Sequence, residues 1–599
     1  MTKSKISNLK SQIAKSIHLI LAVCHVSLVM CHWSFARAQD PPPDVRFGAV
    51  EAWNDPVAAA EAGVGWERII FYWSELQRNG PEDWNSYHVP DDRLALAASM
   101  GREVVGLLEG TPAWATDGPV YCGVPRGLYL PIDDPGNLWA AFVRRVAGTY
   151  AGRVDHWIIW NEPDIAPDTF SAEWCGSIEE YYQLLKVAYL AAHQANPNVV
   201  IHMTGLTYFH DIEFGRPYYL KRLLAVAAQD PTGPEHGYYF DVVSLHIYFE
   251  IKNFAMVLRD TRATLAAYGL QKPIWVNETD APPNDDPFYP LPQANFQISL
   301  EEQASFLLQA FSLALSEGAE RIAVYKWVVD ANPPAGREPN GIVRSDHSRR
   351  PAYDAYRLVT THYAGTISAR EDRHSLYTVV TLDRGGLTTR VLWARTEADV
   401  TVSLPALAAQ ARLVDQTGAE QSIEPVDGQY TLILPHARCA DKRGCIIGGT
   451  TYLLVEESGG APPPAGTVTP APTEFPVETI TPTLTETATI TTPLDASTPF
   501  STTTPVPTPT YTPISTLSPT SEPSPTPTPT SFPTPTPTPP PTHTLTPSLS
   551  PTPISSPTPT PWPSVPATPG PPVLPVLVGL GTVTLLAALA GTLFKRRGR

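Results

Sequence analysis

The sequence predicts an α/β protein built on a (β/α)8 TIM barrel, followed by a small all-β sandwich domain. Short apolar runs rich in Val, Ile and aromatic residues alternate with helix-compatible segments, and eight such runs lie within residues 43–365. Short alternating runs bounded by turn residues then fill residues 370–457. The first pattern predicts the barrel and the second predicts the sandwich.

The eight predicted barrel strands recur at the spacing of strand–helix units. They are 45–50, 67–73, 103–109, 155–162, 199–205, 240–248, 273–279 and 321–327. Because strands that alternate with helices pair in parallel, eight units over this length favour a closed barrel over an open sheet. No GxGxxG or Walker A motif follows the first run, which argues against a nucleotide-binding sheet.

The N-terminus predicts export. Several lysines precede an apolar stretch from Ile17 to Met30, and Ala36-Arg37-Ala38 supplies a small-x-small cleavage site. We therefore expect a signal peptide over residues 1–38, with an uncleaved signal anchor as the alternative.

The C-terminal part predicts a stalk and an anchor. Residues 458–572 are dominated by Pro, Thr and Ser, which predicts a disordered, extended linker. The apolar run 573–594 is long enough to cross a bilayer core of about 30 Å as a transmembrane helix. The basic tail 595–599 predicts a cytoplasmic end, so the rest should lie on the extracellular face of the cell membrane.

The composition of the chain limits the classes of ligand and cofactor that we expect. A net charge of −17 argues against nucleic acid as a partner, because such binding gains from Lys and Arg that neutralise phosphates. Neither CxxC nor HExxH occurs, so we predict no catalytic metal and no cofactor. The protein is expected to act as a monomer.

Four cysteines remain after the predicted signal peptide, and in an exported chain they predict disulfides. Cys439 and Cys445 are close enough in sequence for a local clip. Cys122 and Cys175 follow the third and fourth predicted strands, whose loops are neighbours in a barrel. We therefore expect these two pairings.

Two glutamates stand where barrel chemistry is expected. Barrel active sites form at the carboxyl ends of the strands, and Glu162 ends the fourth run while Glu278 ends the seventh. Hydrolysis of a glycosidic bond needs two such carboxyls, one that donates a proton and one that attacks the anomeric carbon or activates water. The pattern therefore predicts a glycosidase.

The motifs around these glutamates resemble a known group. "WNEP" at residues 160–163 and "VNET" at residues 276–279 are similar to the clan A glycoside hydrolases, which are retaining (β/α)8 enzymes. The resemblance implies that Glu162 is the general acid/base and Glu278 the nucleophile. "LLEGTPAW" after the third strand looks closer to family 39, the β-xylosidase and α-iduronidase group, than to family 5, but the choice stays open.

The same resemblance implies roles for five further residues. Asn161 would bind the sugar 2-hydroxyl, and Arg68 would steady the nucleophile unless it pairs within the barrel base. His246 and Tyr248 would contact the nucleophile or the substrate, although a satisfied core histidine is the alternative. Trp327, expected at the end of the eighth strand, would be an aromatic platform beneath the sugar.

Residues near the third strand add two candidates. Trp114 is expected to wall a subsite, and Glu109 to bind ligand or to pair with a neighbouring base. Asn277 begins a formal glycosylation sequon, but a glycan there would block Glu278, so we predict that it is unmodified.

Three functions fit this pattern. A retaining hydrolase of poly- or oligosaccharides uses both glutamates, whereas a carbohydrate-binding adhesin has no need of them. A transglycosylase of envelope glycans shares the same residues. The sugar, the linkage and the role of the β domain stay open.

Overall fold

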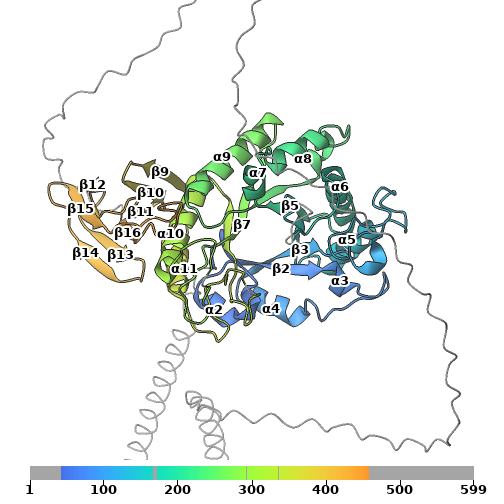
Figure 1. Ribbon diagram of the computed structural model, residues 1–599, viewed down its shortest axis with the longest axis horizontal. Helices are drawn as coiled ribbons and strands as arrows, with labels where there is room; N and C mark the ends of the chain where they lie inside the picture. The colour runs from blue at the N-terminus through green and yellow to red at the C-terminus, as the bar shows by residue number, and fades with distance from the viewer. Residues whose placement is uncertain (1–41, 166–171, 292, 335, 458–599) are drawn as a thin grey trace, which may run out of the picture. The chain divides into compact units, whose positions relative to one another are not determined.

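Eight parallel strands close into a barrel in the computed structural model, in the order β1 to β8, with β8 pairing back to β1 (Figure 1). They are β1 (Phe47–Val50), β2 (Trp66–Tyr72), β3 (Glu103–Glu109), β4 (His156–Asn161), β5 (Val200–Leu206), β6 (Val242–His246), β7 (Ile274–Thr279) and β8 (Arg321–Val324). Each strand overlaps one of the predicted runs, so the predicted barrel is confirmed. The eighth strand ends earlier than expected, at Val324 rather than near residue 327.

The structure describes residues 42–165, 172–291, 293–334 and 336–457. The predicted signal peptide (1–38), stalk (458–572), transmembrane helix (573–594) and tail (595–599) lie outside these residues. Within the ranges described, no helix is both long and apolar enough to span a membrane.

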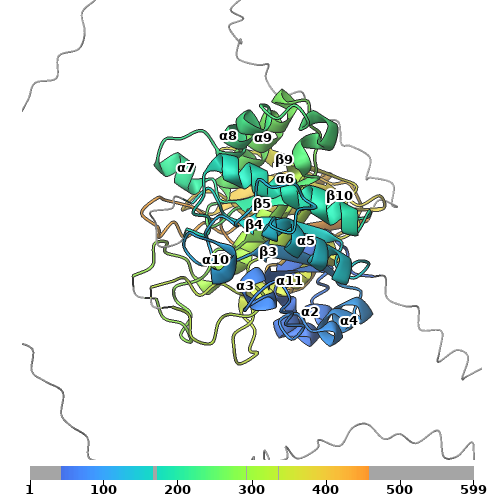
Figure 2. The same ribbon diagram turned by 90° about the vertical axis from the view of Figure 1, so that its right-hand side faces the viewer.

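Helices surround the central strands, as the view of Figure 2 shows for β3, β4 and β5. They are α2 (Pro56–Glu61), α3 (Trp73–Leu76), α4 (Asp91–Ser99), α5 (Leu138–Thr149), α6 (Ile178–Ala195), α7 (Phe209–Glu213), α8 (Tyr219–Ala227), α9 (Lys252–Ala267), α10 (Leu300–Ser316) and α11 (Pro351–His362). The long helices α6 and α10 each begin with a capping box, Ser177 with Glu180 and Ser299 with Glu302, which satisfies backbone N–H groups of the first turn.

The barrel interior is packed rather than open. The rings of Trp66 on β2 and Trp275 on β7 meet with centroids 5.1 Å apart, although these strands are not neighbours in the sheet. Leu107 and Ile158 belong to the same buried cluster. Since this layer closes the barrel, groups that act on a ligand must lie at the carboxyl ends of the strands.

An antiparallel β domain follows the barrel. Its strands are β9 (Ser368–Arg373), β10 (Tyr377–Asp383), β11 (Leu387–Ala394), β12 (Val400–Pro405), β13 (Ala411–Asp415), β14 (Glu420–Ile423), β15 (Gln429–Leu434) and β16 (Tyr452–Glu457). A six-stranded sheet runs in the order β14-β13-β16-β11-β10-β9, and β12 pairs with β15 in a separate two-stranded sheet.

The six-stranded sheet is covered on both faces. On β11, Leu392 and Ala394 join the core shared with β12 and β15, whereas Val391 and Trp393 join the core of the barrel. This alternation is the period-2 pattern of a strand that is buried on both sides. The β domain therefore packs against the barrel, beside α10 and α11 (Figure 1).

Polar contacts fix the β domain to the barrel. The side-chain nitrogen of Gln309, on α10, donates to Thr451 Oγ1 at 3.0 Å and to the carbonyl of Gly449 at 3.1 Å. A carboxylate oxygen of Asp441, which lies inside the Cys439–Cys445 clip, accepts from the backbone N–H of Gln297 at 2.9 Å. These contacts show the β domain supporting α10 and the loop that follows β7.

Candidate active site

Glu162 and Glu278 meet at the carboxyl end of the barrel. Glu278 lies on β7 and Glu162 directly follows β4. One oxygen of each carboxyl group and a ring nitrogen of His246 all lie within 4.8 Å of one another. Two residues far apart in sequence thus face a single small space.

Glu278 is held as an anion. It is 4 % exposed, and its two oxygens have different partners: Arg68, at the middle of β2, forms an ion pair with Oε1, and the hydroxyl of Tyr248 donates to Oε2. Burial alone would raise the pKa of Glu278, but the charge of Arg68 and the hydrogen bond from Tyr248 hold it below its ordinary value. The side chain is therefore ionised and oriented.

Glu162 has the opposite electrostatic character. The side chain of Glu162 is 18 % exposed to solvent, and its Oε1 lies 2.6 Å from His246 Nδ1. Burial and the negative charge of Glu278 raise the pKa of Glu162 well above its ordinary value. Two carboxyls with pKa values shifted in opposite directions are the arrangement expected of an acid and a nucleophile.

His246 joins the two carboxyls. It is fully buried, and Nδ1 lies 3.4 Å from Glu278 Oε2 as well as close to Glu162. Burial lowers the pKa of His246 to about 4, so the ring is neutral above mildly acidic pH. Its Nε2 lies against Gly205 on β5, where an added Cβ would come within 2.0 Å of that nitrogen. Glycine at this position is therefore required to seat the ring.

The backbone is strained beside Glu162. Trp160 and Glu162 have φ angles of 70° and 41°, in the left-handed region that residues other than glycine seldom adopt. The hydroxyl of Thr204 donates to the carbonyl of Trp160 at 2.9 Å, and the N–H of Glu162 donates to the carbonyl of Gly205 at 3.2 Å. Strain that the surroundings hold in place is common where a side chain must be aimed at a reacting group.

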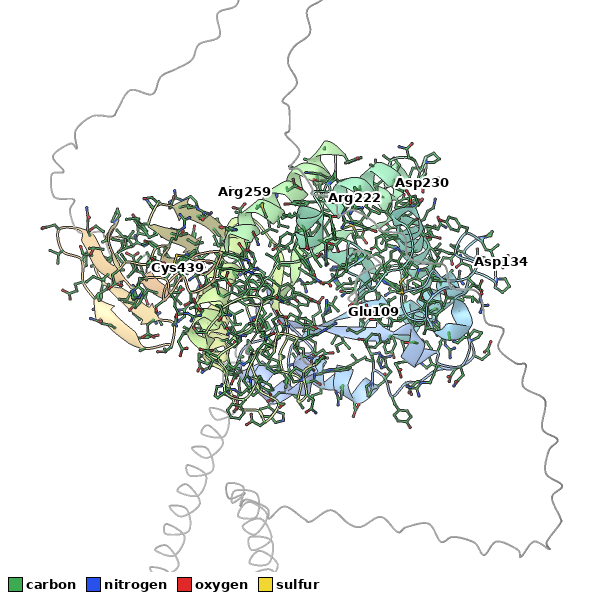
Figure 3. The ribbon with its side chains drawn as sticks, in the orientation of Figure 1. Glu109, Asp134, Arg222, Asp230, Arg259 and Cys439 are labelled. Carbon is green, nitrogen blue, oxygen red and sulfur yellow. A yellow bond between two sulfur atoms is a disulfide. The ribbon has the colours of Figure 1, made fainter. Side chains whose placement is uncertain are left out.

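Asn161 and Glu109 have partners that we did not expect. The amide nitrogen of Asn161 donates to Glu173 Oε2 at 2.8 Å, and the hydroxyl of Tyr121 donates to Glu109 Oε1 at 3.0 Å. Glu109 and Glu173 are themselves in hydrogen-bond contact, which requires a shared proton. The predicted salt bridge of Glu109 with a base is wrong, because its partners in the described residues are a tyrosine and another carboxyl group. Figure 3 labels Glu109 among the barrel strands.

The predicted sugar platform at Trp327 is wrong. β8 ends at Val324, three residues before Trp327, and the indole is 0 % exposed. Its ring packs on Tyr353 and Tyr356 of α11, and its N–H donates to the carbonyl of Asp55 at 3.2 Å. A ring covered in this way has no face for a sugar.

Trp114 remains partly exposed. Its ring packs edge-on against Trp73, and its N–H donates to the carbonyl of Gln77 at 2.6 Å. Its contacts do not include either central carboxyl group, so its predicted place in a subsite wall stays a prediction.

Two residues near the carboxyls were not singled out from the sequence. Tyr325, just beyond β8, packs its ring edge-on against Tyr248 at 6.1 Å and lies 5.9 Å from the guanidinium of Arg68. Glu173 lies in the loop after β4, two positions before Cys175. The only signal for Glu173 was that cysteine, since a predicted disulfide ties its loop to the site.

Both predicted disulfides are present, Cys122–Cys175 and Cys439–Cys445. The first joins the loops after β3 and β4, as their neighbouring strands led us to expect. The second lies in the β domain, where Figure 3 labels Cys439. Asn277, the predicted unmodified sequon residue, is 0 % exposed and offers no access to a glycan-transferring enzyme in the folded chain.

Glu162, His246 and Glu278 lie close enough together that each could offer one ligand atom to a metal ion, since these atoms are within 4.8 Å of one another. The guanidinium of Arg68, however, already supplies a positive charge to Glu278. A metal ion held between Glu162 and Glu278 would lie directly against this guanidinium and be repelled, so the charges around the pair favour acid–base and nucleophilic chemistry.

No protein-family model matches the chain, and no curated protein matches it. A family 39 glycoside hydrolase from Bacteroides cellulosilyticus is similar, with a TM-score of 0.51 and 17 % identity over 69 % of this chain and 81 % of that one. The likeness establishes a shared fold.

Two further solved structures also match over 69 % of this chain and 97 % of their own lengths. They are a family 30 endoxylanase from Clostridium papyrosolvens, with a TM-score of 0.47 and 13 % identity, and a monomeric β-xylosidase from Caulobacter crescentus, with a TM-score of 0.47 and 14 % identity.

Proposed function

We propose that this protein is a retaining glycoside hydrolase of poly- or oligosaccharides. The observation that carries the proposal is the pair Glu162 and Glu278, which share one small space and have pKa values shifted in opposite directions. One oxygen of each carboxyl group lies within 4.8 Å of an oxygen of the other. This closeness supports retention, because retaining enzymes hold their two carboxyl groups roughly 5–5.5 Å apart. Inverting enzymes hold the two carboxyls roughly 6.5–9.5 Å apart, to leave room for water.

The chemistry follows from these two environments. Glu162, kept protonated, donates its proton to the leaving oxygen while the ionised carboxylate of Glu278 attacks the anomeric carbon. The glycosyl–oxygen bond breaks and a covalent glycosyl-enzyme forms on Glu278. Glu162, now ionised, takes a proton from water, and the resulting hydroxide displaces Glu278 with the original anomeric configuration. The fold of the family 39 structure is consistent with this activity.

Replacement of the two glutamates tests the proposal. Glu278→Ala should abolish turnover of an activated aryl glycoside, and azide should restore it with an inverted glycosyl azide as product. With Glu162→Ala, azide should instead give the retained product. Glu179→Gln, an exposed carboxyl on α6, serves as the control and should keep full activity.

Two results would contradict the proposal. NMR of the first product from the unmodified enzyme should show the starting anomer, and the opposite anomer would reject retention. Normal hydrolysis by the double variant Glu162→Gln/Glu278→Gln would place the chemistry elsewhere. If the unmodified protein binds sugars but hydrolyses none of them, an adhesin is favoured. If it transfers the sugar mainly to other sugars and not to water, a transglycosylase is favoured.

We also propose that the enzyme is exported, acts as a monomer and is held on the outer face of the membrane by residues 573–594. The sequence of both termini supports this location, and the two disulfides agree with an oxidising compartment. Protease treatment of intact cells should release the barrel into the medium. Recovery of the full-length chain in the cytosol would contradict the location.

A further inference from the structure

Beside the proposed catalytic pair lies a group of three oxygen-bearing side chains, here named the acceptor cluster: Glu109, Asn161 and Glu173. Glu109 ends β3 and Asn161 ends β4, while Glu173 lies in the loop after β4. Asn161 Nδ2 donates to Glu173 Oε2 at 2.8 Å, and the carboxyls of Glu173 and Glu109 are in hydrogen-bond contact. The cluster is therefore continuous, and one of its members, Asn161, directly precedes Glu162 in the chain.

Apart from the proton that Glu109 and Glu173 share, two buried oxygens of this cluster have no hydrogen-bond partner among the described residues. They are Glu109 Oε2 and Asn161 Oδ1. Glu109 is 2 % exposed and Asn161 is 9 % exposed, so bulk water does not fully compensate them. The amide nitrogen of Asn161 bonds to Glu173, while the oxygen of the same amide group is left without a partner. Buried acceptors without partners are costly, and they call for a ligand that supplies donors.

The charge of the cluster specifies what kind of donor fits. Burial and the negative charge of Glu173 raise the pKa of Glu109 well above its ordinary value, so the two carboxyls share a proton when the site is empty. Arg68 is a nearby cation, but its Nη2 is committed to Glu278. A ligand that brings a positive charge would relieve the repulsion between the two carboxylates, whereas an added carboxylate would increase it.

We propose that the acceptor cluster binds the ammonium group of an amino sugar, so that the natural substrate carries a free primary amine on the sugar at the cleavage site. An ammonium offers three N–H donors and one positive charge, which match Glu109, Asn161 and Glu173. A hydroxyl offers one donor and no charge, and an N-acetyl group would place a methyl group among unsatisfied oxygens. This inference rests on the proposed glycosidase activity and names its substrate class.

The first experiment needs no variant. The unmodified enzyme is supplied with matched 4-nitrophenyl glycosides of both anomeric configurations, derived from glucosamine, N-acetylglucosamine and glucose and from the corresponding galacto sugars, at mildly acidic pH where the amine is protonated. We expect kcat/KM for an amino glycoside to exceed that of its hydroxyl and N-acetyl counterparts on the order of ten- to one-hundredfold, the range of charged hydrogen bonds. A hydroxyl glycoside that is hydrolysed as well as its amino counterpart would overturn the inference.

Variants of the cluster form the second experiment. Glu109→Gln and Glu173→Gln keep the shape but remove the charge, so each should bring the preference for the amine close to one, while Glu179→Gln should leave it unchanged. A preference for the amine that persists in both variants would place its recognition elsewhere. If the neutral glycosides are cleaved in a Glu278-dependent reaction without any amine preference, the proposed function stands and this inference fails.

A metal ion is the other cation that the cluster could meet, and a titration separates the two. Calcium chloride is added to the unmodified enzyme and to Glu109→Gln/Glu173→Gln, and binding is measured by calorimetry. Three protein oxygens fall short of the six to eight that calcium takes, so we expect no stoichiometric binding. One-to-one binding that is lost in the variant would assign the cluster to a metal and overturn the amino-sugar assignment.

Discussion

Arg68 and Glu278 form a buried ion pair that joins β2 to β7 and keeps the proposed nucleophile ionised. Replacing Arg68 by Gln removes the positive charge and should raise the pKa of Glu278. Since only the ionised form attacks, the acidic limb of the kcat/KM profile should move to higher pH. Opposite charges at this range shift a carboxyl pKa by roughly 1–3 units, and the limb should move by about as much.

Arg102→Gln is the matched control for this shift. Arg102 is also a buried β-barrel arginine in an ion pair, with Glu67 at 2.8 Å, but it has no contact with Glu278 among its described partners. Both variants should lose stability, and only Arg68→Gln should change the pH profile. The same profile in both variants would mean that the ion pair is merely structural.

Glu162 governs the opposite limb. Burial and the charge of Glu278 raise the pKa of Glu162, so activity should persist above the range of an ordinary glutamate and fall as pH rises through that pKa. In Glu162→Gln the basic limb should disappear. Hydrolysis of a poor leaving group should drop roughly 10²–10⁴-fold, whereas release of an activated phenol in the first turnover should be largely kept. An equal loss for both leaving groups would argue against an acid role.

Tyr248 offers a test of how Glu278 is oriented. Tyr248→Phe removes the hydroxyl that donates to Oε2 and should lower kcat about tenfold or more, because a hydrogen bond to a charged group is worth about 1.5–3 kcal/mol. The control is Tyr363→Phe, which removes a buried hydroxyl that donates to the carbonyl of Leu308 at 2.9 Å. Equal kcat in the two variants would show that Tyr248 does not act on the nucleophile.

The sequence alone predicted where the barrel strands lie and that Glu162 and Glu278 come together. It did not predict the surroundings of Trp327 or the presence of Glu173 near the two carboxyls. Periodic apolar runs locate buried strands because burial is a local property of the pattern, and barrel closure then brings Glu162 and Glu278 together. Trp327 was misplaced because the apolar pattern does not show that β8 ends at Val324, three residues before the tryptophan. Glu173 was missed because it lies on a loop, and loops lack the regular residue spacing that predicts side-chain positions in helices and strands.

Trp327 is expected to serve the stability of the fold. Since the indole is buried against α11, Trp327→Ala should lower the free energy of unfolding by about 3–5 kcal/mol, as measured by denaturant titration. The KM of the fraction that remains folded should be unchanged. A raised KM with unchanged stability would instead indicate that Trp327 contacts the sugar.

The Cys122–Cys175 disulfide should matter both for stability and for the active site. It closes a loop with a sequence separation of 53, and the chain-entropy relation for loops of this size gives a stabilisation of about 4 kcal/mol. Cys439–Cys445, with a separation of 6, should contribute only about 2 kcal/mol by the same relation, so Cys439→Ser/Cys445→Ser is the matched control.

Loss of the Cys122–Cys175 bridge should also loosen the loop after β4. In Cys122→Ser/Cys175→Ser the backbone N–H of Cys175 should still donate to the carbonyl of Cys122, at 2.9 Å in the intact protein, so the loop should stay near its position but move more freely. Because Glu173 lies two positions away, the added freedom should raise KM more than it lowers kcat. Equal stability losses in the two double variants would exclude loop closure as the cause, and an unchanged KM would show that the bridge does not position the loop of Glu173.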